Sequence, residues 1–589
     1  MNILRLTAFS VIGMSIMAAV SCGQGPEDGV HRLEILTTGD VHGSWFDTPY
    51  VGDGQKSSLF AVKYYVDSVR NAVGADNVLL LDAGDCLQGD NAAYYYNYID
   101  TLSPHLFPRL VSYMGYDAVA VGNHDIETGH GVYDRVAREL DGYGIPFLGG
   151  NAIRNGSGKP YFPIYKIFRR GGLKVTVLGF TNPNMKAWLA EDLWSGMTFE
   201  SLIPLVQEDV DMVREKERPD VVVVVTHSGT GKGDGSMYEN QGLDLLVSLK
   251  GVDFIVCAHD HRPCIMQGET CLIDGGSHGR NIGHGSIEVE VRDGKVVSRS
   301  LSAEVIPVDK SKADAEMREA FRKEFETVRT FTVQPIGGLL TDMRTRDSYP
   351  GMCDYMNLIH AVSLSSTGAR VSFAAPLTYD GKIDAGTLVY NDLFTIYPYE
   401  NQLFVLQMTG REIKDCLEYS YGGWVNTIGE GSAAGPLLKI HGEGDPRYAQ
   451  ERWSFENRPY NFDSAGGIVY TVDVTEPVGS RVSIESFADG SAFCADSTYD
   501  VAMTSYRANG GGGHLAAAGI ADSGDRIIAR YPEIRELIYL YIKENGAIDP
   551  AVTGEESRIG RWKFVPEGLV AGKMRRDMAL LFGPSSSGE

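Results

Sequence analysis

The sequence lacks the cysteine patterns that define disulfide frameworks, zinc sites or redox motifs. Its 589 residues include eight cysteines, and no two of them form a C-x-x-C pair. If Cys22 is modified, as argued below, seven cysteines remain, and an odd number does not suit complete disulfide pairing. Cys264 and Cys271 can pair across a predicted hairpin, and the sequence leaves that choice open.

The sequence also lacks an excess of positive charge and, after its first residues, any long apolar run. No later segment is long and apolar enough to cross a membrane as a helix. Lysine and arginine number 53 against 77 aspartates and glutamates, which makes the formal net charge −24. Because a nucleic-acid backbone would be repelled, we exclude a nucleic-acid duplex as a partner. A small anionic substrate is compatible with this balance where bound cations dominate the local field.

The first residues are typical of an export signal. Arg5 supplies a positive charge and is followed by an apolar segment that is too short to span a bilayer. The residues around Cys22 resemble a bacterial lipobox, with Ala19 in place of the usual leucine. We therefore predict a signal peptide over residues 1–21 and a lipidated tether over 22–29. The protein would then be a periplasmic or cell-envelope lipoprotein that contacts the membrane only through its lipid anchor. The alternative is an ordinary signal peptide with an accidental cysteine.

The length of the chain predicts two domains, because 589 residues exceed what one hydrophobic core supports. Residues 30–308 alternate apolar strands with amphipathic helices, which predicts an α/β sandwich of two mixed sheets flanked by helices. The expected buried strands are Leu33–Leu36, Val78–Leu81, Ala118–Val121, Val221–Val225 and Phe254–Val256. Helices are expected at Ser58–Ala72 and Leu106–Met114, and hairpins at Pro163–Leu178 and Ser286–Ser300.

The rest of the chain predicts a connector, a second domain and a tail. Residues 309–330 are charged and helical in character, so we expect one interdomain helix there. Residues 331–550 predict an α+β domain, and residues 551–589 a partly disordered tail. The expected helices are Gly351–Ser363, Gly410–Glu418 and Glu533–Glu544, and the expected strands are Val371–Ala374, Leu403–Met408, Ile468–Val474 and Tyr499–Thr504. The connection from 422 to 463 is long enough to be functional or disordered.

Seven potential metal ligands lie in five short segments of the first half of the chain. They are Asp40, His42, Asp85, Asn123, His227, His259 and His261. Each segment alone is weak, since D-x-H and G-N-H-D are common in ordinary turns. Together they follow apolar strands, and ligands gather at the carboxyl ends of strands in open α/β sheets. A pair of divalent cations needs such a mixture of carboxylate, imidazole and amide ligands, and imidazole favours zinc, manganese or iron over magnesium or calcium.

This ordered set resembles the calcineurin-like metallophosphoesterases. It is most similar to the two-domain family of 5′-nucleotidases, UDP-sugar hydrolases and 2′,3′-cyclic-nucleotide phosphodiesterase/3′-nucleotidases, over residues 33–541. The resemblance implies an α+β nucleotidase domain in the second half and two metals that share Asp85. One metal would also take Asp40, His42 and His261, and the other Asn123, His227 and His259. In this family a metal-bound hydroxide attacks phosphorus.

The resemblance also implies the residues that assist that attack. The family's catalytic histidine matches His124, and its orienting carboxylate matches Glu127, which replaces the aspartate of 5′-nucleotidases. Asp125 is a second candidate partner for His124. Three other histidines near these motifs, His130, His278 and His284, are expected to be ordinary loop residues rather than ligands of a third metal.

The family stacks a nucleobase between two aromatic rings of the second domain. Tyr399, in Tyr-Pro-Tyr-Glu-Asn, matches one ring, and Tyr506, before a glycine run, matches the other. We add Asn401 and Arg507 as candidate substrate-binding residues. Flat rings suit a base because stacking tolerates base identity. Against this, the chain has 30 tyrosines, and most of them must serve packing.

Flanking residues indicate the subclass. The arginine-bearing stretch of 5′-nucleotidases matches residues 372–377, which contain no arginine. The run from Ser505 to Gly513 looks like the cyclic-nucleotide phosphodiesterase/3′-nucleotidase pattern. We therefore favour a phosphoester hydrolase acting on nucleotides in that subclass. The alternatives are a 5′-nucleotidase, a UDP-sugar hydrolase or another sugar-phosphate phosphatase, and a surface binding protein without turnover. No feature of the sequence indicates an oligomeric state.

Overall fold

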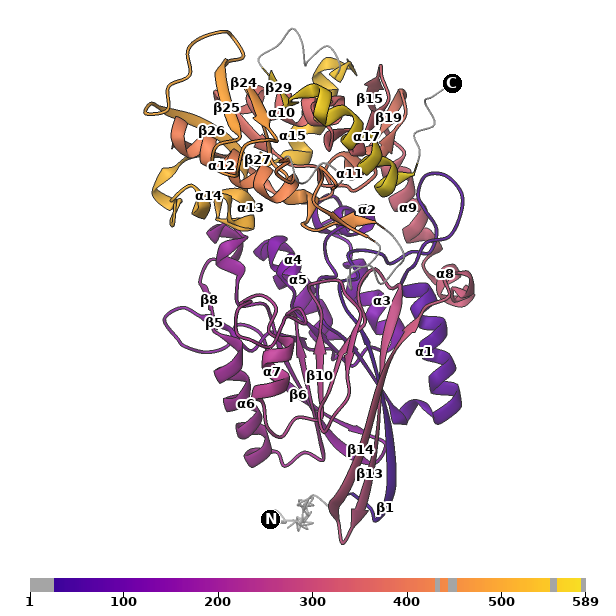
Figure 1. Ribbon diagram of the computed structural model, residues 1–589. Coiled ribbons are helices and arrows are strands. Elements are labelled where there is room, and N and C mark those ends of the chain that lie inside the picture. The colour runs from indigo at the N-terminus through magenta and orange to yellow at the C-terminus, as the bar shows by residue number, and fades with distance from the viewer. Residues whose placement is uncertain (1–25, 430–434, 443–452, 551–558, 584–589) are drawn as a thin grey trace, which may run out of the picture.

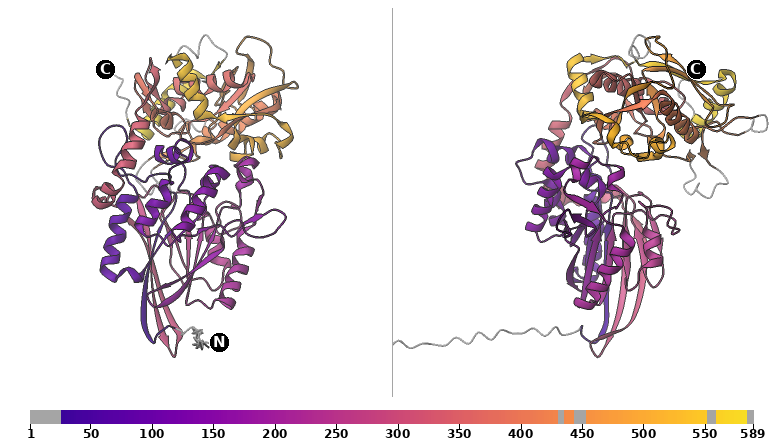
Figure 2. Two further views of the ribbon diagram at one scale, coloured as in Figure 1. Left: turned by 180° about the vertical axis from the view of Figure 1, so that it is seen from behind. Right: turned by 90° about the vertical axis from the view of Figure 1, so that its left-hand side faces the viewer.

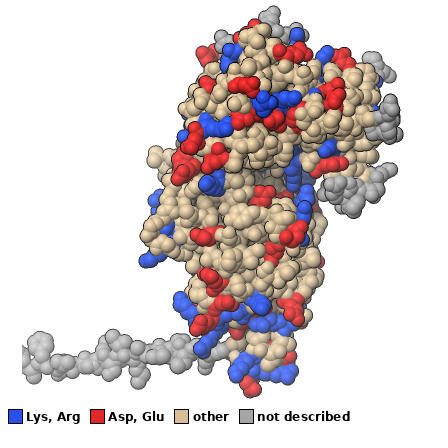
Figure 3. Space-filling model, turned by 60° about the vertical axis from the view of Figure 1, so that its left-hand side comes forward, with Lys and Arg blue, Asp and Glu red and all other residues tan. Residues whose placement is uncertain are grey.

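The protein forms two domains stacked end to end, as a computed structural model shows (Figure 1). The structure describes residues 26–429, 435–442, 453–550 and 559–583. The predicted signal peptide, Cys22 and the first part of the tether therefore lie outside the described residues. Acidic and basic side chains are interspersed on the face drawn in Figure 3. Within the described residues, no helix is both long enough and apolar enough to span a membrane.

Two six-stranded sheets form the centre of the first domain, which confirms the predicted sandwich. The sheets have the orders β14-β13-β1-β2-β3-β4 and β11-β12-β10-β9-β7-β6. The strands of the first are β1 Gly29–Thr38, β2 Val78–Asp82, β3 Ala118–Ala120, β4 Phe147–Leu148, β13 Asn281–Arg292 and β14 Lys295–Pro307. Those of the second are β6 Tyr165–Arg170, β7 Leu173–Phe180, β9 Val221–Thr226, β10 Phe254–Cys257, β11 Cys264–Met266 and β12 Cys271–Asp274. Parallel and antiparallel pairs occur in both sheets.

The valine run of β9 shows why these strands are apolar on both sides. Val221, Val223 and Val225 pack between the sheets, whereas Val222 and Val224 pack against the outer helices. A strand covered on both faces must be a continuous apolar run. Helices α1 Leu59–Val73, α3 Leu106–Met114 and α5 His130–Gly142 cover the first sheet, and α6 Leu202–Lys216 and α7 Gly242–Ser248 cover the second.

The connector is two helices, α8 Ala315–Ala320 and α9 Arg322–Thr332, rather than one. They meet at Phe321, whose φ of −112° is not helical. Phe321 is buried in the core of the first domain together with Met317 and Val328. The break therefore lets both helices pack their apolar residues on the first domain, and the connector is attached there (Figure 2).

A five-stranded mixed sheet forms the centre of the second domain, in the order β23-β17-β26-β20-β27. Its strands are β17 Val371–Ala374, β20 Gln402–Thr409, β23 Ser464–Gly466, β26 Thr498–Thr504 and β27 Ile527–Glu533. Along β20, Leu403 and Val405 pack on the side of α10 Asp354–Thr367 and α15 Ile534–Asn545, while Phe404 and Leu406 pack on the side of α12 Gly410–Trp424. This alternation is the period of a strand between two helical layers.

The structure extends the second domain beyond the expected end at residue 550. Strand β29 Gly560–Val565 pairs in parallel with β24 Ile468–Asp473, and α17 Glu567–Phe582 follows it. Trp562 is buried and stacks on Tyr470 with ring centroids 5.8 Å apart. Residues 551–558 and 584–589 lie outside the described part of the chain.

The seven cysteines in the described residues form no disulfide. Cys264 and Cys271 do lie in the hairpin of β11 and β12, but Cys264 is opposite Asp274. The two cysteines therefore occupy different rungs of the hairpin, and the pairing that the sequence left open is absent.

Candidate metal centre and substrate cavity

Five strand ends bring the seven predicted metal ligands together. The segments follow β1, β2 and β3 of one sheet and β9 and β10 of the other. Because strands of both sheets end at the same edge of the sandwich, residues up to 221 positions apart in sequence become neighbours. The carboxyl ends of parallel strands are the expected place for such a crevice.

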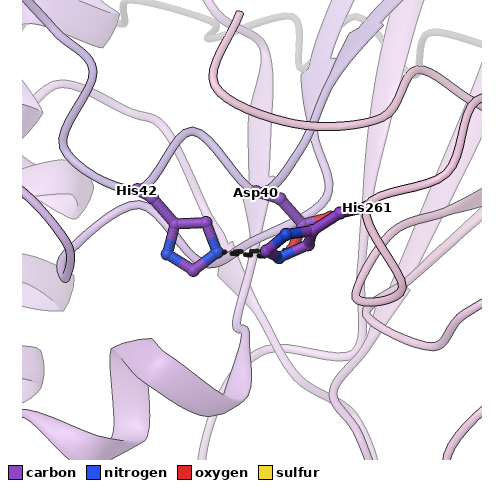
Figure 4. A group of neighbouring side chains, drawn as sticks. All are labelled: Asp40, His42 and His261. Atoms are coloured by element: carbon purple, nitrogen blue, oxygen red, sulfur yellow. Dashed lines mark hydrogen bonds and ion pairs between the residues drawn. The ribbon is translucent and has the colours of Figure 1, made fainter. Parts of the chain in front are cut away.

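Asp40, His42 and His261 form the first group of potential ligands, with their donor atoms within 4.8 Å of one another. The Nε2 atoms of the two histidines face each other at 3.0 Å (Figure 4). Asp40 Oδ1 lies 3.5 Å from His261 Nε2 and 3.9 Å from His42 Nε2. Two imidazoles and a carboxylate that converge in this way can hold one cation.

Asp85, His227 and His259 form the second group. His227 Nε2 lies 2.9 Å from Asp85 Oδ2, and His259 Nδ1 lies 2.9 Å from Asn123 Oδ1. The two groups adjoin, because His227 Nε2 is also 3.9 Å from Asp40 Oδ1. The structure thus brings all seven predicted ligands into one pair of adjoining groups, while the sharing of Asp85 between two metals stays a prediction.

The residues present fit divalent cations. Asp40 Oδ1 is buried and has no hydrogen-bond partner among the described residues, which is costly unless a cation compensates it. His227 donates from Nδ1 to the Ala83 carbonyl at 2.8 Å, and His42 donates from Nδ1 to Gln88 Oε1 at 3.2 Å. Both histidines therefore turn the lone pair of Nε2 towards the centre. Burial and neighbouring histidines hold the pKa of His42 well below its usual value, so its ring is neutral, as a metal-binding imidazole must be.

Backbone strain is concentrated at this centre. Eight non-glycine residues of the described chain have a left-handed φ, and six of them lie here. They are Asp40 (48°), His42 (47°), Asp85 (59°), His259 (86°), His261 (59°) and His278 (59°). Such backbone costs about 1–3 kcal/mol per residue and persists where the surrounding structure enforces it. The fold therefore stabilises the ligand geometry at the expense of local strain.

Asp125 has a structural role and does not contact the His124 ring. Its carboxylate, fully buried, accepts hydrogen bonds from the backbone N–H groups of Asp85, Cys86, Leu87 and Gly122. Those bonds fix the loop that carries Asp85 against the loop that carries Asn123. Asp125 is therefore occupied and does not compete for His124.

The partner of His124 is Glu127, as the resemblance implied. His124 Nδ1 and Glu127 Oε2 are 2.5 Å apart, and the His124 backbone N–H donates to Asp85 Oδ1 at 2.7 Å. Burial lowers the pKa of His124, but Glu127 and Asp85 together outweigh it and raise the pKa to about 10. The His124 ring lies beside the ligand groups rather than within them.

A cavity of about 530 Å³ joins the ligand groups to the second domain. Tyr399, Asn401 and Tyr506 line it together with His124. The Tyr399 ring lies parallel to the His124 ring, with centroids 6.2 Å apart and planes inclined by 22°. Both predicted base-stacking rings therefore line one cavity with the candidate metal centre, although they belong to the other domain.

Arg507 also borders this cavity, but its guanidinium is fully engaged. Nε and Nη2 donate to the two oxygens of Asp463 at 2.8 Å each, and Nη1 donates to the Gly511 carbonyl. Nη2 donates further to the Tyr460 carbonyl at 3.1 Å, and Nη1 donates its second hydrogen to Asn461 Oδ1 at 3.4 Å. The structure therefore places Arg507 as a support for the loops that carry Tyr506 and Tyr460, with no donor left for a substrate.

Four residues of the site were missed from the sequence. Gln88 contacts His42, and Trp188 stacks on His259 with ring centroids 5.1 Å apart. The His278 ring lies 5.4 Å from the His42 ring and lines the cavity, although His278 belongs to neither ligand group among the described residues, as expected. Tyr460 packs edge-on against Tyr506 at 6.4 Å. Tyr460 lies in the long connection that the sequence marked as functional or disordered, whereas Trp188 and His278 carry no local signal.

The other two histidines have the ordinary contacts that we expected. His130 contacts Asp134 and Tyr161, and His284 contacts Glu34 and Tyr65. Neither belongs to a ligand group among the described residues.

Comparison with known proteins agrees with this geometry. A family model described as calcineurin-like phosphoesterase matches residues 33–263, and one described as 5′-nucleotidase, C-terminal domain, matches residues 328–519. Among solved structures, a candidate 5′-nucleotidase from Staphylococcus aureus, in complex with α-ketoglutarate, superposes with a TM-score of 0.74 at 22% identity. That match covers 90% of this chain and 99% of the other. At this identity the superposition shows the fold alone.

Two curated relatives extend over nearly the whole chain. A 2′,3′-cyclic-nucleotide 2′-phosphodiesterase/3′-nucleotidase from Salmonella typhimurium is 24% identical over 95% of this chain and 92% of that protein. The trifunctional nucleotide phosphoesterase protein YfkN from Bacillus subtilis is 24% identical over 93% of this chain, which spans 40% of that longer protein.

The fold and the ligand groups together define a calcineurin-like phosphoesterase that binds divalent metal. The chain belongs to the two-domain family in which this catalytic domain is joined to a 5′-nucleotidase C-terminal domain. It is a metal-dependent phosphoesterase.

Proposed function

We propose that the protein hydrolyses nucleotide phosphoesters, with a preference for 3′-nucleotides and 2′,3′-cyclic nucleotides. One observation carries this proposal: the rings of Tyr399 and Tyr506 line the cavity onto which the metal-ligand groups open. A nucleobase held there would place its phosphate towards Asp85 and His124. Base stacking on tyrosine contributes about 1–3 kcal/mol per base and tolerates base identity.

The residues of the chain can perform each part of the reaction. Asp40, His42 and His261 would hold one cation, and Asp85, Asn123, His227 and His259 the other; zinc, manganese or iron suit these imidazoles best. Cations there would supply Lewis-acid chemistry and offset the charge of the phosphate. His124, held by Glu127, is placed to donate a proton to the leaving oxygen.

The wall of the cavity supports the 3′ or cyclic preference. The stretch Phe373–Leu377 contributes apolar side chains there, where the 5′-nucleotidases carry arginines. Among the described lining residues, Arg458 and Arg507 are the only lysines or arginines, and Asp463 neutralises Arg507. The substrate-binding arginines of the 5′-nucleotidases therefore have few counterparts in this wall. The Salmonella relative, whose match with this chain covers 92% of its own length, bears the name of this subclass.

Inorganic phosphate release from a substrate panel tests the proposal. The panel holds 3′-AMP, 2′,3′-cyclic AMP, 5′-AMP, UDP-glucose and 4-nitrophenyl phosphate, with Mn²⁺ added and Asp85→Asn as the inactive control. We expect the highest kcat/KM for 3′-AMP and the cyclic nucleotide. A preference for 5′-AMP or UDP-glucose would assign the alternative subclass. Activity no higher than that of Asp85→Asn on every substrate would favour a binding protein.

We also propose that the protein is exported and anchored by lipid at Cys22. In its support, the described chain begins at the end of the first domain that lies opposite the second domain (Figure 1). An anchor there would hold the cavity away from the membrane surface. Mass spectrometry of the protein from a bacterial envelope tests this: a diacylglyceryl mass on Cys22 is expected, and a free cysteine or an N-terminus elsewhere would contradict it.

A further inference from the structure

Gln88 links the candidate metal centre to the second domain through its side-chain amide. The residue is 3% exposed and lies at the boundary between the domains. Its Oε1 accepts a hydrogen bond from His42 Nδ1 at 3.2 Å, and its Nε2 donates to the carbonyl of Pro398 at 3.1 Å. One amide thus contacts a metal ligand of the first domain and the segment that carries Tyr399.

The first-domain end of this link is rigid. Leu87 N donates to Asp125 at 3.0 Å, and the Leu87 carbonyl accepts from Asn97 at 2.7 Å. The backbone directly before Gln88 is therefore fixed on both of its polar groups. The amide can adjust only through its own side-chain torsions, so its two partners must lie in the observed positions for both bonds to form.

The second-domain end is equally well held. Arg535, which is 1% exposed, donates to the carbonyls of Tyr397 and Pro398 at 3.3 and 3.1 Å and pairs with Glu400. Its guanidinium also lies 4.9 Å from the centre of the Tyr94 ring, which belongs to the first domain. The segment 397–400 is therefore a rigid part of the second domain that reaches Gln88 only when the two domains sit as observed.

We propose that Gln88 is a positioning residue that couples the seating of the second domain, which means its observed position on the first domain, to metal binding at His42. With the domains seated, the amide is oriented by Pro398, and it holds His42 with its Nε2 lone pair towards the first cation. A hydrogen-bond partner on the remote nitrogen of a metal-binding histidine fixes its orientation and raises its basicity. Thermodynamic reciprocity then requires that a cation at His42 stabilise the seated arrangement of the segment 397–401.

Two variants distinguish the contribution of the Gln88–His42 hydrogen bond from that of the Gln88–Pro398 hydrogen bond. Gln88→Leu removes both bonds with little change in volume. Gln88→Glu keeps an acceptor for His42 but, when ionised, has no donor for Pro398. Asn91→Ala is the matched control, because Asn91 donates to Asn391 across the same boundary at 2.8 Å and contacts no metal ligand.

The experiment uses the full chain, freed of metal and titrated with Mn²⁺. The dissociation constant comes from competition with an indicator chelator, and hydrogen exchange of the segment 397–401 is followed with and without Mn²⁺. We expect Gln88→Leu to weaken Mn²⁺ binding by about 10- to 100-fold, the usual effect of losing such a support. Mn²⁺ should slow exchange of the segment in the wild type and in Asn91→Ala, but not in Gln88→Leu. Gln88→Glu should retain Mn²⁺ affinity and lose the protection.

The outcomes are distinct. Unchanged Mn²⁺ affinity in Gln88→Leu overturns the role at His42. Weaker affinity with full protection of the segment means that Gln88 supports His42 without coupling, which overturns the proposal. None of these readouts uses a nucleotide, so they succeed or fail independently of the proposed substrate class. Equal thermal unfolding midpoints for the variants and the wild type establish that the comparison is between folded proteins.

Discussion

Removal of the His124 side chain should lower turnover without loss of metal. The His124 ring lies outside both ligand groups, and its contact with Asp85 is made by the backbone N–H, which His124→Ala retains. The variant should therefore keep its divalent ions. Loss of a positioned acid lowers the rate by about 10²- to 10⁴-fold, which corresponds to about 3–5 kcal/mol in the activation free energy.

The leaving group decides whether His124 acts as an acid. The nucleoside leaving oxygen of 3′-AMP needs a proton, whereas 4-nitrophenolate leaves without one. We therefore expect a much larger loss of kcat for 3′-AMP than for 4-nitrophenyl phosphate, measured at saturating Mn²⁺ together with metal content. Glu127→Gln is the matched variant, because it keeps a partner at Nδ1 and should lose less activity than His124→Ala. Equal losses on both substrates would refute the proton-donor role, and parallel loss of metal would refute the placement of His124 outside the ligand groups.

Three further perturbations have defined outcomes. Tyr399→Ala should raise KM for nucleotides by the equivalent of about 1–3 kcal/mol and leave KM for 4-nitrophenyl phosphate nearly unchanged, and an equal rise for both would argue against stacking. Gly122→Ala should abolish metal binding in a calorimetric titration, because its Cβ would lie 2.1 Å from Asp85 Oδ1; normal binding would show that the loops can separate. Asp463→Asn should lower the free energy of unfolding at pH 7 by about 3–5 kcal/mol, since Arg507 is then buried without its counter-charge. Burial raises the pKa of Asp463, but Arg507 and His514 lower it more. The stabilisation that the Asp463–Arg507 pair gives the wild type is therefore present above pH ~4 and is lost as the pH falls further. The variant's denaturation midpoint should lose that acid dependence, and an unchanged profile would contradict the pairing.

The sequence predicted the main strands and the ligand set for a clear physical reason. A strand buried on both faces, such as Val221–Thr226, is a continuous apolar run, and a polar residue directly after it, such as His227, stands out. The order of such residues along the chain does not depend on the details of the loops. For that reason the five segments could be assigned before any geometry was known.

The remainder depended on contacts between residues distant in sequence. Arg507 was expected to bind substrate, but Asp463, 44 positions earlier, occupies its guanidinium. Trp188 and His278 reach the centre from loops without any local pattern. The break at Phe321 follows from the shape of the core that it enters, which a helical charge pattern does not contain.

The strained backbone of the candidate ligand residues could not be predicted from their local conformational propensities either. Aspartate and histidine adopt a left-handed φ only infrequently, yet Asp40, His42 and His261 all do so here. Their conformation is enforced by neighbouring loops, for example by the bond from His259 N to Asp40 Oδ2 at 2.7 Å. Sequence reasoning therefore selected residues that the structure brings together, but it did not predict the backbone strain with which they are held.

The account rests on two cations bound at the adjoining groups, and elemental analysis of active protein is its most direct test. We predict two divalent ions per chain, lost together with phosphoesterase activity in Asp85→Asn and restored with activity when Mn²⁺ is returned to chelator-treated wild type. Full activity in protein that contains no divalent metal would contradict the account.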